Sequence, residues 1–446
     1  MQDLSNRIII LLIITYIITQ FYSPPVLYIV TVILTTLVML LSMIFSRVLP
    51  RIFSGIMIGI GIIIMYVQKA GFEVWAESIT KNLPLVCLII VVPILTIPIE
   101  IGKYDDSITQ FASKLNGKPQ LLYIFLSSTF YILGPITNLG SIHIIHSIVK
   151  IMNLPVEFLG RLYIRGFSSI NTWSPYFASV FLVVYYLNIP MLYFLPFGLL
   201  LSFFQFWTAN IVFSFKEKQS INFGAIESKA NIRKKKLYEL LFFLLLLSGT
   251  IFILEVESAI NVSVIIIITA IVYSFIWGKY LKEFRRFIKE VNLFQKKIIP
   301  SQANEVSLFL SAGFFGVVLS KTVISDIFSD LWTQISHLSI LLLILFTIAL
   351  VGLLSFVGIH QIVVITSILS SVSPTNVGLH DITFAMILLS SWVVAGTVSP
   401  ITPTNVVTSN ILKVDVYQII LKWNLLYTVL ISCVHTMVIY CVHLLL

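Results

Sequence analysis

The feature that most constrains this chain is a series of apolar runs, each long enough to cross a bilayer's hydrocarbon core of about 30 Å. Examples are Val26–Ser46, Pro84–Ile101, Pro190–Phe213, Leu237–Leu254, Ala259–Trp277 and Trp423–Leu446. The chain is 58% hydrophobic and 11% charged, whereas a soluble domain is about a quarter charged. We therefore expect an all-α polytopic protein of the cell (cytoplasmic) membrane, with about 10 to 12 transmembrane helices.

Half of the 28 basic residues lie in two short segments. The first holds Lys216, Lys218, Lys229, Arg233, Lys234, Lys235 and Lys236, and the second holds Lys279, Lys282, Arg285, Arg286, Lys289, Lys296 and Lys297. Basic loops stay on the cytoplasmic side of a membrane. We expect the loops Ser220–Lys236 and Lys282–Lys297 to be cytoplasmic, and the acidic turn Glu255–Glu257 between them to lie outside. Binding of lipid headgroups or proteins is the alternative to a role in orientation alone.

Two parts of the chain carry the same succession of motifs. The span Pro84–Ile101 is followed by "GKYDDSITQFASKLNGKPQLLYIFL", and the span Val306–Thr322 by "KTVISDIFSDLWTQISHLSILLLILF". Further on, "GSIHIIHSIV" matches "VGIHQIVVITSIL", which aligns His143 with His360, and "NTWSP" matches "GTVSP". The offset is nearly constant, and topology counted from the basic loops reverses the direction of crossing. This pattern predicts an inverted repeat, which is typical of secondary transporters with a site near the bilayer midplane.

The repeat divides the chain into four parts. We expect N-terminal scaffold helices (1–83), the first repeat (84–213), a segment of basic loops with a linking helical hairpin (214–304), and the second repeat (305–446). The first apolar run ends at Pro24-Pro25 without a small-residue cleavage site, which favours a first span over a removable signal. The three cysteines have no metal or redox spacing, which favours packing roles.

Proline clusters with hydroxyl and amide side chains interrupt the apolar runs. A proline inside a helix costs roughly 3 kcal/mol, and backbone groups freed at membrane depth must be satisfied by protein or a polar cavity. The clusters contain Asn171, Thr172, Ser174 and Pro175 in the first repeat, and Thr397, Ser399, Pro400, Thr402, Thr404 and Asn405 in the second, while a third break adds Thr137 and Asn138. Exposed half-helix N-termini attract anions, and exposed carbonyls with hydroxyl oxygens suit Na⁺. The alternative is that each cluster only kinks a helix and donates hydrogen bonds to neighbouring helices.

The titratable residues near these breaks are few. Histidine titrates near neutral pH, so His143 and His360 are candidate proton carriers or anion ligands, and the alternative is a packing role. His146 lies on the same helix face as His143, but two histidines without a carboxylate make a poor metal site, and we predict none. The break segments contain no Asp or Glu, which favours an anionic or neutral substrate over a cation.

The chain resembles the ion transporter superfamily in its layout of two halves of inverted topology. Each half has an amphipathic arm, a glycine-containing hairpin region and a later helix broken at a Ser/Thr/Asn/Pro cluster. That group includes divalent-anion/sodium symporters, arsenite transporters and the large membrane subunits of TRAP carriers. The resemblance covers residues 84–446 apart from the central basic region. It implies re-entrant hairpins, a homodimer with a static scaffold, and a transport domain that moves like an elevator. It further implies a carboxylate-like solute bound at paired tips, usually with sodium. The Ser-Asn-Thr signature of the dicarboxylate symporters is absent, and "NTWSP" and "SPITPTN" occupy its place. By this resemblance, the residues expected to act as ligands are Asn171, Thr172, Ser174, Thr397, Ser399, Thr404 and Asn405.

The expected function is secondary active transport of a small anionic solute, coupled to Na⁺ or H⁺, without cofactor, catalytic residues or a nucleic-acid partner, and with membrane lipids around the protein. A lipid or polyprenyl-phosphate flippase would use the same anion-holding breaks, and a lateral opening lined by Arg or Lys would favour it. A membrane enzyme of lipid-linked sugar metabolism requires catalytic residues on sizeable outside loops, and the outside loops expected here are short.

Overall fold

The computed structural model describes residues 2–115, 117–217 and 234–446. All regular secondary structure in these residues is helical, and ten helices are long and apolar enough to cross a membrane by length and composition. The predicted all-α polytopic membrane fold is therefore confirmed. Most of the first predicted cytoplasmic loop, Ser220–Lys236, lies outside the described residues, and with it Lys229 and Arg233; Lys218 of the same basic segment also lies outside them. The side of the membrane on which each loop lies stays a prediction.

The chain forms two compact units, each assembled from three stretches of sequence. Unit 1 comprises Met1–Ile97, Gly249–Gln334 and Ile362–Val377, and unit 2 comprises Pro98–Ser248, Ile335–Gln361 and Gly378–Leu446. The units thus interleave along the sequence, whereas the four predicted parts are consecutive. The four predicted parts follow the sequence repeat and do not coincide with the two compact units.

Unit 1 is built around one long helix. Its helices are α1 (Gln2–Thr19), α2 (Pro25–Phe45), α3 (Val48–Val67), α4 (Phe72–Thr80), α5 (Leu83–Val91), η1 (Val92–Leu95), α14 (Val262–Tyr280), α15 (Phe284–Leu319), most of α18 (Gln361–Ser371), and η5 (Thr375–Val377). The helix α15 packs against α1 to α5. A Cβ at Gly61 would lie 2.4 Å from the Phe314 ring, so this glycine allows α3 to approach α15 closely.

The predicted loop Lys282–Lys297 is wrong for most of its length, because α15 begins at Phe284. Phe287 and Val291 are buried and lie four residues apart, which places them on one face of a helix. The basic residues of this segment lie on either side of these two positions or between them, and all are exposed. An amphipathic pattern therefore continues the helix outside the expected span, and the predicted boundary at residues 304 and 305 falls within α15.

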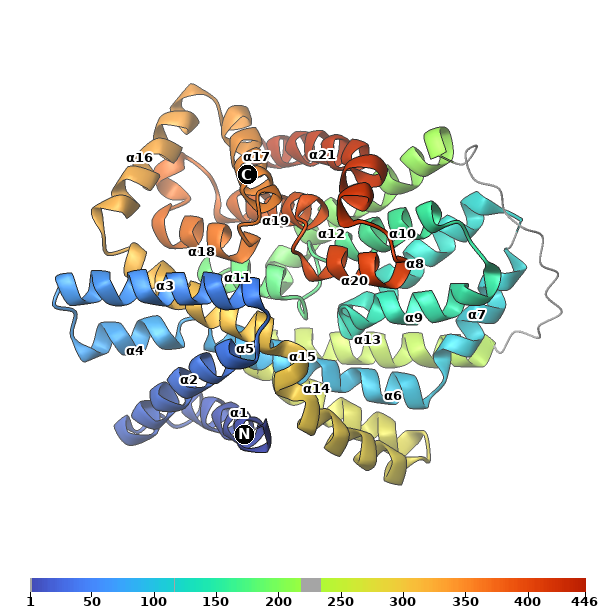
Figure 1. The fold of residues 1–446 in the computed structure, drawn as a ribbon, viewed down its shortest axis with the longest axis horizontal. Coiled ribbons are helices and arrows are strands. Elements are labelled where there is room, and N and C mark those ends of the chain that lie inside the picture. The colour runs from blue at the N-terminus through green and yellow to red at the C-terminus, as the bar shows by residue number, and fades with distance from the viewer. Residues whose placement is uncertain (1, 116, 218–233) are drawn as a thin grey trace. The chain divides into compact units, whose positions relative to one another are not determined.

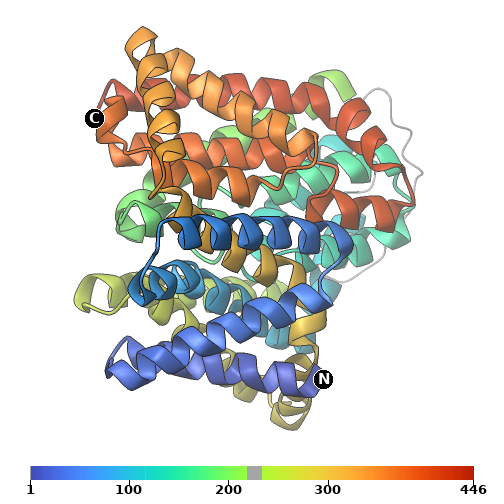
Figure 2. The ribbon, with the colours of Figure 1, turned by 60° about the vertical axis from the view of Figure 1, so that its left-hand side comes forward.

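Unit 2 contains the breaks that the sequence predicts. Its helices are α7 (Tyr104–Lys114), α8 (Pro119–Thr137), α9 (Gly140–Val149), η2 (Lys150–Met152), α10 (Val156–Ser168), α11 (Ala178–Tyr186), α12 (Met191–Val212), η3 (Phe213–Glu217), α17 (Ile340–Phe356), α19 (Asp381–Val398), α20 (Pro403–Leu412), η6 (Gln418–Asn424) and α21 (Leu425–His443). The helices α6 (Thr96–Ile101), α13 (Lys234–Glu257) and α16 (Val323–Leu338) run from one unit into the other. Figure 1 shows α19, in orange-red, close to α21, in red, in agreement with their contacts. Figure 2 shows the same C-terminal helices from a second direction.

The elements recur in the same order in the two predicted repeats. In the first, α5 and α6 lead to the polar helix α7, the packed pair α8–α9, the broken pair α10–α11, and the span α12. In the second, α15 leads to α16, then α17 and α18, the broken pair α19–α20, and the span α21. This order agrees with the repeat that the motifs predict, and the inversion of one half against the other stays a prediction.

Candidate functional site

The first break separates α10, which ends at Ser168, from α11, which begins at Ala178. Its predicted residues Asn171, Thr172, Ser174 and Pro175 are all buried. The Ser179 hydroxyl donates to the Asn171 carbonyl at 2.8 Å, which satisfies one backbone group freed by the break. The Thr172 hydroxyl is buried and has no hydrogen-bond partner.

The span α12 supports this break from the side. Ser202 donates to the Ser169 carbonyl at 2.6 Å, and Gln205 Nε2 donates to the Ser168 hydroxyl at 2.8 Å. A Cβ on Gly198 would lie 2.4 Å from the Thr172 carbonyl oxygen, so the glycine is required for α12 to pack against the break. The broken helix therefore depends on its neighbour for both packing and hydrogen bonds.

The second break separates α19, which ends at Val398, from α20, which begins at Pro403. Asn405 Nδ2 lies within hydrogen-bond distance of three carbonyl oxygens, those of Gly396 (3.0 Å), Thr397 (3.4 Å) and Ser399 (2.7 Å). The Thr402 hydroxyl contacts the Gly396 and Ser399 carbonyls at 3.2 and 3.1 Å. These side chains hold the freed carbonyls in place of backbone amides.

The remaining polar groups of the second break differ in their surroundings. Asn405 Oδ1 is buried and has no hydrogen-bond partner. The Thr397 hydroxyl donates to the Val394 carbonyl at 2.8 Å. Pro400 and Thr404 are only half-buried.

The aligned motifs "NTWSP" and "GTVSP" adopt the same local turn. The Ser174 hydroxyl accepts a hydrogen bond from the Tyr176 backbone N–H at 3.3 Å, and the Ser399 hydroxyl accepts one from the Ile401 N–H at 3.4 Å. Both serines precede a proline, which has no N–H of its own. The correspondence found in the sequence therefore extends to hydrogen bonding.

The helices flanking the two breaks pack against one another within unit 2. The helix α10 contacts both α19 and α20, and α11 contacts α19. In Figure 1, α10 lies near α19 and α20, in agreement with these contacts. The structure thus brings the two predicted clusters onto adjoining elements of one compact unit.

The third break lies between α8 and α9, and the two aligned histidines differ in their exposure. The helix α8 ends at Thr137, Asn138 has a φ of 47°, and α9 begins at Gly140. Thr137 donates to the Leu133 carbonyl of its own helix at 3.0 Å. His143 is exposed, whereas His360, just before α18, is buried. The two histidines therefore occupy different environments. In the described part of the chain no group of three or more His, Cys, Asp or Glu is arranged to hold a metal ion.

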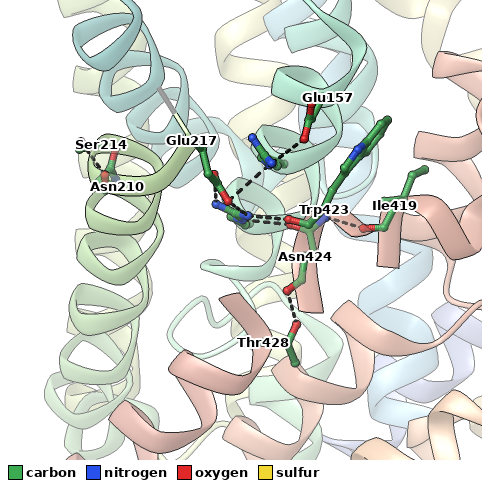
Figure 3. A network of polar contacts seen from close by, with 10 residues as sticks. Glu157, Asn210, Ser214, Glu217, Ile419, Trp423, Asn424 and Thr428 are labelled. Carbon is green, nitrogen blue, oxygen red and sulfur yellow. Dashed lines mark hydrogen bonds and ion pairs between the residues drawn. The ribbon is translucent and has the colours of Figure 1, made fainter. Parts of the chain in front are cut away.

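A buried ion-pair network, which the sequence did not predict, lies on α10 (Figure 3). The fully buried Arg165 side chain binds Glu217 through two hydrogen bonds, Nη1 to Oε2 at 2.8 Å and Nη2 to Oε1 at 2.9 Å. Its Nε donates to Asn424 Oδ1 at 3.0 Å, and Nη2 donates to the Trp423 carbonyl at 2.7 Å. A guanidinium has five N–H donors in a fixed planar arrangement, and these four bonds use most of them.

A second arginine extends the network. Arg161 Nη2 donates to Glu157 Oε1 at 2.5 Å, and its Nε lies 3.4 Å from Glu217 Oε1. Two arginines thus face two carboxylates, and their formal charges cancel. The break segments contain no carboxylate, but folding brings Glu217 to Arg165, which lies in the last turn of α10 before the first break. Two arginines four residues apart, with Glu157 four residues before the first of them, were the signal that could have located this network.

The arrangement of the two breaks is suited to binding. A threonine hydroxyl can donate to an anion, while an amide oxygen can only accept a hydrogen bond or coordinate a cation. Buried polar atoms without partners are costly in a folded protein. Thr172 and Asn405 are therefore the site residues whose unpaired atoms a bound solute or ion would satisfy.

Among solved structures, the chain is similar to the crystal structure of the YdaH transporter of Alcanivorax borkumensis, described as having an unusual topology. The two share 12% sequence identity with a TM-score of 0.57, over 81% of this chain and 85% of that one. At this identity the likeness shows a common fold alone. No protein-family model matches the sequence, and no curated protein does.

Proposed function

We propose that this protein is a secondary active transporter that moves a small anionic, carboxylate-like solute across the cytoplasmic membrane. The observation that carries the proposal is the pair of broken helices in unit 2. Their flanking segments pack together, and each break holds a buried oxygen without a partner, Thr172 Oγ1 and Asn405 Oδ1. Irregular backbone at membrane depth is tolerated where it is buried or lines a polar cavity, which is where transporters bind their substrates.

The fold supports the same function. Ten candidate spans within the described residues make a polytopic membrane protein, and the similar solved structure is a transporter. An enzyme of lipid-linked sugars would need a group that attacks or protonates its substrate. The groups found at these breaks are hydroxyls and amides that bind through hydrogen bonds.

The coupling ion, the elevator mechanism, the inverted repeat and the homodimer belong to this proposal. Both breaks lie in the same compact unit, and an elevator requires that the whole substrate site move with one body. Backbone carbonyls and the Asn405 oxygen are suitable Na⁺ ligands. H⁺ is the alternative coupling ion, with the buried His360 as candidate carrier.

A flippase for lipid or polyprenyl phosphates gains no specific support from the arginines. Arg161 and Arg165 are buried and paired with Glu157 and Glu217. Because these carboxylates balance their charge, the two arginines do not supply the basic lining that would attract a phosphate headgroup.

The test begins with purified full-length protein and a panel of mono- and dicarboxylates, inorganic anions and polyprenyl phosphate, each with and without Na⁺. A carboxylate that raises the melting temperature, more strongly with Na⁺, is expected to accumulate in reconstituted vesicles when a gradient of the coupling ion is imposed. Stabilisation by polyprenyl phosphate alone, or vesicles that take up none of the stabilising anions, would contradict the proposal.

A further inference from the structure

We propose that Arg165 is a positioning residue that fixes the two breaks relative to each other, through Glu217 and α12 on one side and through Asn424 and Thr428 on the other. Its consequence for transport rests on the proposed function, whereas the mechanical link does not. The link lies within unit 2 and consists of hydrogen bonds together with the helices α12 and α21 that carry them. Figure 3 shows its centre, with Glu217, Asn424 and Thr428.

The first step is that Arg165 holds the ends of two irregular helical segments. Glu217 is the last residue of η3, and Asn424 is the last residue of η6. Both segments are π-helical, and they are the two π-helical segments of the described residues. Such wide turns are rare and are often found at functional sites. One guanidinium therefore ties α10 to residues of both π-helical segments.

The second step leads from Asn424 to the second break. The Thr428 hydroxyl lies 3.0 Å from the Asn424 carbonyl and 3.0 Å from Thr397 Oγ1. Thr397 donates its own proton to Val394, so it accepts from Thr428. Because Thr428 has one proton, that proton bonds either its own helix or the break. The Thr428 hydroxyl thus links α21 directly to Thr397 and can exchange this bond for one to the Asn424 carbonyl.

The third step leads from Arg165 to the first break. The Ser168 hydroxyl donates to the Arg165 carbonyl at 3.0 Å and accepts from Gln205 of α12. Ser202, one turn earlier on α12, donates to Ser169. The span that ends at Glu217 therefore holds the start of the first break, as α21 holds Thr397 at the second.

The energetics favour a positional role over a stabilising one. Desolvation offsets much of the attraction in a buried ion pair, and apolar replacements are often no less stable. The planar guanidinium instead fixes direction, because its donors meet the carboxylate in two parallel bonds. A lysine would keep the charge and lose that geometry.

The decisive comparison uses two threonines of α21. Thr428 and Thr436 are both buried, and each contacts the carbonyl four residues earlier, at 3.0 and 2.7 Å. Thr428 alone of the two contacts Thr397. We expect Thr428→Val to accelerate amide hydrogen exchange in residues 399–406 of the full-length protein by about threefold to tenfold, the range of interhelical hydrogen bonds in membranes. Thr436→Val should leave that segment at the wild-type rate. Equal exchange in the two variants overturns the proposal.

A second variant tests the centre of the link. Arg165→Lys should raise exchange at both breaks, 169–177 and 399–406, by about tenfold. Glu157→Gln, which alters the same network but no atom of the path, should leave 399–406 unchanged. Uniform acceleration throughout unit 2, or acceleration confined to α10, contradicts the proposal. If Arg165→Lys does not fold, the comparison of Thr428→Val with Thr436→Val tests the proposal.

The exchange measurement needs no ligand, so its outcome is independent of the proposed function. Selective exchange in a protein that transports no anion would leave the link in place and refute the transporter. Where uptake of a carboxylate is found, Thr428→Val should raise its KM about threefold or more, at an unchanged melting temperature, and Thr436→Val should not.

Discussion

The two breaks in unit 2 share a motif but are held in different ways. At corresponding positions, the Asn171 carbonyl accepts a bond from Ser179, and the Gly396 carbonyl accepts one from Asn405. The next residue differs more. The Thr172 hydroxyl has no partner, whereas the Thr397 hydroxyl bonds within its own helix and to α21.

The two breaks also differ in which part of the chain supplies the side chains that hydrogen-bond their backbone. The carbonyls of the second break are bonded by Asn405 and Thr402, which belong to the same short stretch of chain. The first break receives one bond from its own side, from Ser179, and two from Ser202 and Gln205 of α12. The second break should therefore be the more rigid of the two. The first should respond to movement of α12, and its free Thr172 hydroxyl is the more available to a ligand.

The largest expected effect is on the self-supported break. Asn405→Ala removes the amide that serves three carbonyls, and each buried group left unpaired costs about 1–3 kcal/mol. We expect a loss of ~3 kcal/mol, seen as a lower melting temperature. Asn410→Ala, on the exposed face of α20, is the matched control. A wild-type melting temperature for Asn405→Ala would mean that the break is held by its packing.

A smaller effect should follow from loosening the externally supported break. Ser202→Ala removes the bond to Ser169, and interhelical hydrogen bonds in membranes are worth about 0.6 kcal/mol on average. Hydrogen exchange should rise about threefold in residues 169–177 and stay unchanged in 399–406. Ser128→Ala, which loses only a bond to Ile124 within α8, controls for the loss of a hydroxyl. Equal changes at both breaks would remove the distinction between them.

The smallest expected effect is a loss of stability that should be equal at the two breaks. Ser174→Ala and Ser399→Ala each remove one long hydrogen bond from a backbone N–H, at 3.3 and 3.4 Å. Each should cost at most about 0.5 kcal/mol, the lower end for a neutral hydrogen bond. Melting curves of the two variants should coincide. A clear difference between them would show that the aligned serines are not equivalent.

The sequence predicted the breaks because proline and glycine act locally. Pro175, Pro400 and Pro403 lack a backbone N–H and disfavour a helix that continues through them from the N-terminal side, and the neighbouring hydroxyls indicated polar surroundings. The end of α8 at Thr137 followed from the same reasoning, with Asn138 in a left-handed φ. Helix-breaking residues carry information that needs no knowledge of distant contacts.

The ion pair could not be predicted in the same way. Arg165 and Glu217 lie 52 residues apart, and Glu217 precedes a basic segment that suggested a solvated loop end. Only the packing of α12 and η6 onto α10 brings Glu217 and Asn424 to the guanidinium. The long helix α15 was misjudged for a related reason. Charged residues were interpreted as a loop, although Phe287 and Val291 bury one face of a continuing helix.

The central claim is that the breaks form a substrate site, and the most direct measurement is anion uptake by Thr172→Val against Thr383→Val. Both threonines are buried, and both hydroxyls lack a partner, so neither change should lower the melting temperature. Thr383 lies in the first turn of α19, far along the helix from the break. In vesicles supplied with the carboxylate that stabilises the wild type, Thr172→Val should lose about tenfold or more in apparent affinity, the value of a hydrogen bond to a charged group. Thr383→Val should transport like the wild type. Wild-type affinity in Thr172→Val would contradict the account.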